Sequence, residues 1–97
     1  IYKITSLFPK EEIYSLTSQM RRAAVSVPSN IAEGAARAFN KEFVHFLYIS
    51  LGSLSEIETQ LILAKEFKYI EDDSLIFKLM DEIRRMLIGL IKFKKEQ

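Results

Sequence analysis

Helix-breaking residues are scarce in this chain of 97 residues, which holds two prolines and three glycines. No proline follows Pro28, so most of the sequence lacks the residue that ends helices most effectively. Folds rich in strands need more turn residues than this. Plentiful leucine, isoleucine, alanine, glutamate, lysine and arginine favour long helices instead. The sequence therefore predicts an all-α fold.

Apolar residues recur every three or four positions in three long segments, which is the spacing of a helix that buries one face. We expect helices over about residues 9–37, 40–67 and 74–94, the second of them capped by Asn40. Pro28 predicts a kink in the first of these long helices. The expected buried stripes are Ile13, Leu16, Met20, Ala23, Val27, Ile31, Gly34 and Ala38; Phe43, Leu47, Ser50, Leu54, Ile57, Leu61 and Ala64; and Ile76, Leu79, Ile83, Met86, Leu90 and Phe93.

A short apolar segment precedes the long helices. Ile1, Ile4 and Leu7 have the spacing of the last turns of a helix, and we interpret residues 1–7 as the remainder of a longer one, because seven residues are too few for an isolated helix. Short links force neighbouring helices to run antiparallel. The prediction is one domain over residues 1–97, an antiparallel up-and-down four-helix bundle whose first helix is truncated.

The later helices carry more apolar residues than one stripe requires, such as Tyr48 and Ile62 in one and Leu75 and Ile88 in the other. A wide apolar arc indicates a second buried face. Either these residues cover a fuller first helix, or they pack against other subunits. We expect a homo-oligomer, because large exposed apolar patches normally mark an interface.

Common catalytic and metal-binding arrangements are missing from the sequence. There is no cysteine and a single histidine, His45. Glu42 and His45 have the spacing used in di-iron bundles, but those sites need two such pairs and further glutamates, so we interpret His45 as a helix-surface residue. No phosphate-binding glycine motif occurs. We expect a protein that is not an enzyme, with no catalytic residue, no metal site and no cofactor.

The chain also lacks a long apolar run and a signal-like segment. We therefore expect a soluble, cytoplasmic protein that has no membrane partner.

The net charge is only +1, but its distribution is uneven. Residues 1–41 contain six basic and three acidic residues, which suggests a weak basic face on the second helix. Its members are Arg21, Arg22, Arg37 and Lys41. For a monomer we favour a solvated face with a Glu33–Arg37 pair over a site for RNA or DNA. An oligomer would repeat the patch and strengthen its field. Lys92, Lys94 and Lys95 suit the negative end of the last helix.

One stretch resembles a known family. The residues from Leu16 to Gly34, with Phe46-Leu47, Gly52-Ser53-Leu54 and Glu56-x-x-x-Gln60-Leu61, are similar to the four-helix bundle proteins encoded in intervening sequences of bacterial 23S ribosomal RNA genes. The resemblance spans about residues 5–70. It implies an up-down-up-down bundle and a cyclic oligomer, a pentamer, and the family has no established activity.

A related branch, the accessory proteins of diversity-generating retroelements, is similar in fold and binds nucleic acid and a reverse transcriptase through a strongly basic surface. The near-neutral charge of this chain departs from that branch. The positions that match the family form a signature of unknown role: Asn30, Glu33, Gly34, Arg37, Gly52, Ser53 and Glu56. Our structural hypothesis is that Asn30, Glu33, Arg37 and Glu56 form one polar network between helices or subunits.

Together these observations favour a non-enzymatic homo-oligomeric scaffold associated with RNA or the ribosome, with a protein partner as a further expectation. The alternative is a nucleic-acid-binding accessory protein that uses the basic face of the second helix.

Overall fold

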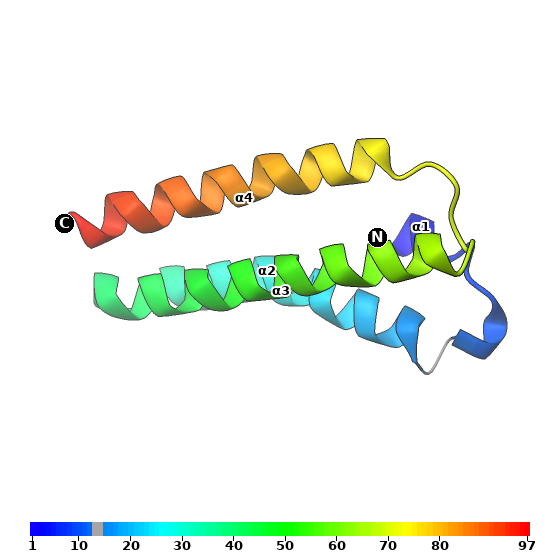
Figure 1. Cartoon of the computed structure of the whole chain (residues 1–97). Coiled ribbons are helices and arrows are strands. Elements are labelled where there is room, and N and C mark those ends of the chain that lie inside the picture. The colour runs from blue at the N-terminus through cyan, green and yellow to red at the C-terminus, as the bar shows by residue number, and fades with distance from the viewer. Residues whose placement is uncertain (13–14) are drawn as a thin grey trace.

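A computed structural model describes residues 1–12 and 15–97, and this part of the chain forms helices and no strand. The elements are α1 (Tyr2–Thr5), the 3-10 turn η1 (Lys10–Glu12), α2 (Leu16–Ala35), α3 (Asn40–Glu66) and α4 (Ser74–Lys95). They make an elongated molecule of 45 × 25 × 16 Å (Figure 1). The predicted all-α helical bundle is confirmed.

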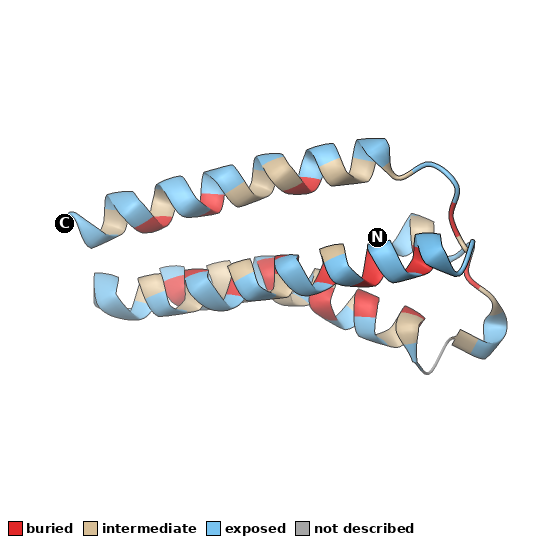
Figure 2. Ribbon diagram, viewed as in Figure 1, coloured by how far each residue is buried: buried red, intermediate tan, exposed pale blue. Residues whose placement is uncertain are grey.

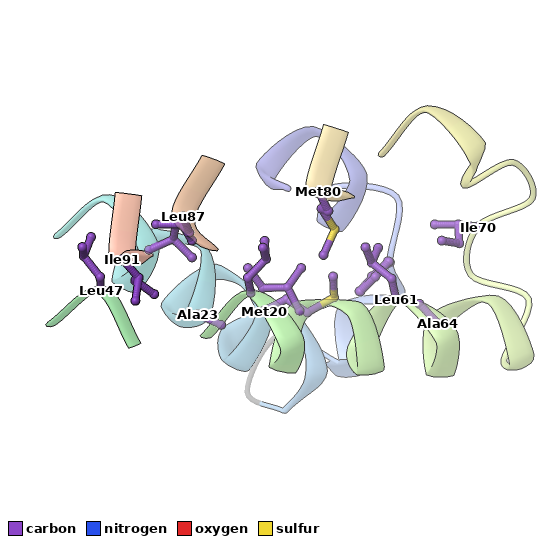
Figure 3. Close-up of a cluster of buried hydrophobic side chains, with 13 residues drawn as sticks. Met20, Ala23, Leu47, Leu61, Ala64, Ile70, Met80, Leu87 and Ile91 are labelled. Atoms are coloured by element: carbon purple, nitrogen blue, oxygen red, sulfur yellow. The ribbon is translucent and has the colours of Figure 1, made fainter. Parts of the chain in front are cut away.

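The α2–α3 pair forms the centre of the fold. The two helices run antiparallel, and α3 buries Leu47, Leu54, Leu61 and Ala64 as its stripe predicted. On α2 the buried residues include Met20, and Figure 3 shows its side chain beside Leu61. Of the expected α2 stripe, Ile13 lies outside the described residues. Burial of these aliphatic side chains is the main force that holds the pair together.

Helix α4 packs on α3 but makes no close backbone approach to α2 within the described part of the chain (Figure 1). Its buried residues are Met80, Leu87 and Ile91, and they lie along the side that faces α3 (Figure 2). The stripe expected for this helix was partly wrong. Three of its members are exposed at 44%, 66% and 55%: Leu79, Met86 and Phe93. Because α4 carries apolar residues on two adjacent stripes, its periodicity alone does not select the one that α3 covers.

The second helix begins later than expected, at Leu16 rather than Pro9. Phe8 is buried and its ring packs on Tyr69, with centroids 5.4 Å apart. Holding Phe8 there turns the chain through η1 before α2 starts. Glu12 then serves the start of α2, because its Oε2 accepts hydrogen bonds from the Ser15 hydroxyl at 2.6 Å and the Leu16 amide at 3.4 Å.

Asn40 does not cap α3 as expected. Phe39 occupies the N-cap position and provides no side-chain hydrogen bond. Asn40 is the first helical residue, and its Nδ2 donates to Oε1 of Gln97 at 3.1 Å. This bond joins the start of α3 to the C-terminal end of the chain.

The link between α3 and α4 covers residues 67–73, close to the expected segment. Lys68 has a left-handed backbone with φ 62°. The amide of Tyr69 donates to the carbonyl of Ala64 at 2.9 Å, and the amide of Lys68 donates to the carbonyl of Lys65 at 3.0 Å. This is the pattern that closes a helix with a left-handed residue. Asp72 Oδ1 accepts hydrogen bonds from the amide and hydroxyl of Ser74, where α4 starts.

Pro28 lies inside α2, which continues as one helix to Ala35. The Ser50 hydroxyl of α3, fully buried, donates to the carbonyl of Val27 at 2.9 Å. The proline therefore sits where α3 approaches closely enough to bond the α2 backbone. A kink at this position stays a prediction.

Candidate nucleic-acid interface

The signature residues gather at the α2–α3 contact in part. The hydroxyls of Ser26 and Ser53 lie 2.8 Å apart, and Asn30 Nδ2 donates both to the Ser26 carbonyl at 2.8 Å and to its hydroxyl at 2.9 Å. Together with the Ser50 hydroxyl this makes a line of polar contacts between two helices. We conclude that Ser53 aligns α3 against α2 through Ser26, and that Asn30 holds the Ser26 hydroxyl from within α2.

The single polar network proposed for Asn30, Glu33, Arg37 and Glu56 does not form within the chain. Arg37 pairs with Glu33 at 2.6 Å, as the i,i+4 spacing predicted, and Glu56 accepts from Gln60 at 3.3 Å. The reason is the antiparallel register, which places Ser53 opposite Ser26 and carries Glu56 further toward the start of α2. An arrangement between subunits stays a prediction.

The two signature glycines differ in their surroundings. A Cβ on Gly34 would lie 2.7 Å from Cβ of Phe46 and 2.9 Å from Cδ1 of Phe43, so only glycine lets α2 and α3 come this close. A Cβ on Gly52 would meet nothing within 4 Å. Gly34 therefore has a structural role within a single chain, whereas Gly52 lies beside open space.

The four residues of the predicted basic face divide into two groups. Arg21 Nε donates to Oγ1 of the buried Thr5 at 2.9 Å, and its guanidinium lies 4.9 Å from the ring centroid of Tyr2. Arg21 thus fastens α1 onto α2. Arg22 is exposed beside it. Arg37 and Lys41 lie roughly 20 Å away along the helix axis.

Lys41 instead lines a hollow together with Lys94 and Lys95 of the last turn of α4, and Arg37 lies on the adjoining hollow. In Figure 1 the end of α2, the start of α3 and the end of α4 lie at the same end of the molecule. We call this region the basic end, defined by Arg37, Lys41, Lys92, Lys94 and Lys95. Sequence reasoning missed the three lysines of α4 as candidates and explained them by the helix dipole alone. The signal that finds them is topological, because antiparallel helices of similar length place the end of α4 beside the start of α3.

Three adjoining hollows cross the basic end. The first, of about 330 Å³, lies between α3 and α4 and is lined by Lys41, Val44 and Lys95 among others. The second, of about 540 Å³, shares Lys41 and Val44 with it and continues to Arg37 and Phe46. The third, of about 350 Å³, shares Lys95 and continues to Tyr48 and Lys92. Their shared lining residues make them one continuous, cation-lined surface.

Aromatic rings lie among these cations. The Arg37 guanidinium is 4.9 Å from the ring centroid of Phe46, and the Lys95 ammonium is 5.8 Å from that of Tyr48. Lys94 lies 5.7 Å from the centroid of Phe43. Such contacts hold long cationic side chains near a ring face while leaving their charges accessible. His45 is exposed, with its ring edge toward Phe46 at 5.7 Å.

The ionisable groups with shifted pKa values lie at the other end. The Ser15 hydroxyl, and after it the Tyr69 hydroxyl, lower the pKa of Glu12. The hydrogen bond to Glu12 raises the pKa of Tyr69. The amide and hydroxyl of Ser74 lower the pKa of Asp72. Each of these shifts is caused by hydrogen bonds at a helix start or in the α3–α4 link.

Glu58 and Arg84 form an ion pair between α3 and α4, half way along the bundle.

In the part of the chain that the structure describes, no three histidine or acidic side chains gather as metal ligands would. None of the helices in that part has the length together with the apolar character needed for a membrane crossing.

Comparison with known proteins gives one family. Residues 1–89 match the family described as 23S rRNA-intervening sequence protein. A search of curated proteins finds no match to the chain.

Proposed function

This chain belongs to the family of 23S rRNA-intervening sequence proteins, and we propose that it is a non-enzymatic, cytoplasmic, homo-oligomeric scaffold that associates with RNA. The proposal joins two parts, self-association and RNA association, and each has its own support and its own test. Self-association rests on one observation above all, the apolar stripe of α4, which this chain covers only in part.

That stripe runs the length of the helix with alternating steps of three and four residues. Its members are Ile76, Leu79, Ile83, Met86, Leu90 and Phe93. Three of them are exposed and three are half-buried. A stripe with this spacing is the seam by which helices of different chains pack together. Covering Leu79, Met86 and Phe93 with a second copy would remove from water three large apolar side chains that this chain alone leaves exposed.

The family resemblance supports a cyclic assembly of five subunits. In a ring, each chain presents the same two surfaces to its neighbours. The outer stripe of α4 supplies one of these surfaces. A pentamer would have about five times the chain mass of 11.3 kDa.

RNA association is supported by the basic end, because a ring repeats that patch around one rim and strengthens its field. The alternative function, an accessory protein that binds nucleic acid through a basic face on α2, is less well supported. Arg21 is engaged with Thr5 and Tyr2, which leaves Arg22 as the exposed arginine of that pair. A protein partner on the remaining exposed faces stays an expectation.

Multi-angle light scattering tests the self-association. We expect the wild-type protein to have a mass several times that of one chain, and Met86→Glu to lower that mass because it places a charge in the seam. Ile88→Glu is the matched control, since Ile88 is an exposed apolar residue of α4 about 200° around the helix from Met86. A monomeric wild-type protein, or equal effects of the two variants, would refute the proposed seam.

A further inference from the structure

The first turn of α3 contains two residues that weaken the helix. Phe39 holds the N-cap position, where serine, threonine, aspartate or asparagine would bond a free backbone amide, and it makes no such bond. Lys41 places a positive charge at the positive end of the helix dipole. Both side chains are exposed, Phe39 at 68%. Residues that oppose stability and contribute nothing to the core are expected where a surface has a function.

Charge collects around the same turn. The hollows of the basic end are lined by five cations and two carboxylates, Glu42 and Glu96, so their lining carries a net charge of +3. Since the whole chain carries +1, the remaining side chains sum to −2. The helix dipole accounts for lysines at the end of α4, but it does not account for Lys41. The near-neutral total therefore conceals a molecule with one distinctly basic end.

Flat apolar rings are exposed beside these charges. Phe39 stands next to the lining residue Asn40, and Tyr48, exposed at 49%, lines the hollow that also contains Lys92 and Lys95. A surface that binds only phosphate needs no such rings. Exposed rings near cations are the arrangement on which unpaired bases stack while the backbone follows the positive charges.

We infer that the basic end is a binding site for single-stranded RNA, with bases stacked on Phe39 and Tyr48 and phosphates held by Lys41, Lys92 and Lys95. The inference rests on the RNA association proposed above and identifies its surface and the form of its ligand. Unpaired RNA fits better than a duplex, because the bases of a duplex are already stacked on each other and unavailable to the rings. Arg37 contributes less, since Glu33 already pairs with it.

The site makes an unusual prediction, because the same substitutions should weaken binding and strengthen the fold. Phe39→Ser supplies a capping hydroxyl to α3 while it removes a stacking ring. Lys41→Glu improves the charge at the helix start while it removes a phosphate contact. Loss of folding cannot then explain a loss of binding, because both variants should unfold at a higher temperature than the wild-type protein.

The test measures fluorescence anisotropy of a labelled oligouridylate of about 12 nucleotides with the full chain, at low and moderate salt. We expect Phe39→Ser and Lys41→Glu each to weaken binding about tenfold. Lys41→Glu should also make the dependence of affinity on salt less steep. The controls are Phe67→Ser, which removes an exposed ring at the opposite end of α3, and Lys78→Glu, which reverses an exposed charge near the start of α4. Both should bind RNA as the wild type does.

The outcomes separate this inference from the proposed function. RNA binding that none of the variants weakens would overturn the site and leave RNA association in place. No RNA binding by the wild-type protein would overturn both, whereas the light-scattering result on self-association would still stand. A duplex RNA that binds as tightly as the single strand would overturn the stacking. A polyglutamate peptide that binds as tightly would assign the surface to an acidic protein partner instead.

Discussion

The hydroxyl of Tyr69 donates a hydrogen bond of 2.9 Å to Oε1 of Glu12, 57 positions earlier in the sequence. The ring of the same tyrosine packs on Phe8. The α3–α4 link is thereby tied to the segment before α2, at the end of the bundle opposite to the basic end. The Glu12 carboxylate also accepts hydrogen bonds from the Ser15 hydroxyl and the Leu16 amide. A single carboxylate therefore connects η1, the start of α2 and the α3–α4 link.

Tyr69→Phe tests this connection through its dependence on pH. The pKa of Glu12 is lowered from its ordinary value of 4.5, chiefly by Ser15 and next by Tyr69, so its contribution to stability is present above that pH and is lost as the pH falls through the lowered value. The pKa of Tyr69 is raised above 10.0, so its contribution is present below that pH and is lost as the pH rises through the raised value. We expect the variant to melt at a lower temperature than the wild type between these limits and the difference to shrink outside them. Thermal denaturation at several pH values measures it, and a difference that does not vary with pH would contradict the role of the pair.

Gly34→Ala should destabilise the protein by about 1–3 kcal/mol, because the added methyl meets Phe46 and Phe43 in a contact that has no room for it. Gly52→Ala is the matched control. It adds the same methyl to open space and should stabilise α3 by up to about 1 kcal/mol through helix propensity. Denaturant titration gives both values. If the two variants shifted stability in the same direction, the close approach at Gly34 would be wrong.

Lys68→Gly should stabilise the protein by about 0.5–1 kcal/mol, because a left-handed backbone costs more for lysine than for glycine. The closing hydrogen bonds to Ala64 and Lys65 would remain. Lys78→Gly, in the regular part of α4, should instead cost about 1 kcal/mol. Chemical denaturation of the two variants checks the difference in sign, and a loss of stability for Lys68→Gly would refute the strain.

Arg21→Ala should loosen α1, because it removes the hydrogen bond to Thr5 and the contact with the Tyr2 ring. Hydrogen exchange of the amides in residues 2–8 should become faster, while exchange in α3 should change little. Arg22→Ala is the control, since Arg22 is exposed, and it should leave α1 protected. Unchanged exchange in Arg21→Ala would mean that Phe8 alone holds the segment.

The stripe of α3 could be predicted from the sequence because its buried positions follow one regular spacing and α3 packs on both α2 and α4. The stripe of α4 could not, because its two apolar stripes satisfy the same periodicity and only contact with α3 distinguishes Met80 from Leu79. The start of α2 was wrong for a similar reason. Pro9 suits a helix start locally, but the burial of Phe8 against Tyr69 is a contact between distant parts of the chain.

The candidate site was predictable to a smaller extent. Arg37 and Lys41 were found as cations, but grouping them with Arg21 and Arg22 assumed that one helix forms one face. The structure gives Arg21 a packing role, and it brings Lys94 and Lys95 to Lys41 from more than 50 positions away in the sequence. Phe39 was overlooked because an aromatic residue in a turn has no periodicity to mark it.

The absence of a close approach between α2 and α4, in the part of the chain described, bears on how the protein folds. Each helix packs mainly on the helix next to it in the sequence, and chains dominated by such local contacts fold quickly. The buried residues that α2 and α3 contribute, such as Met20 and Leu61, lie in a hairpin that is complete in sequence before α4, so this pair can begin to collapse while α4 is still being synthesised. We expect α4 to dock last, onto a finished surface, and to be the first helix to detach when the protein unfolds.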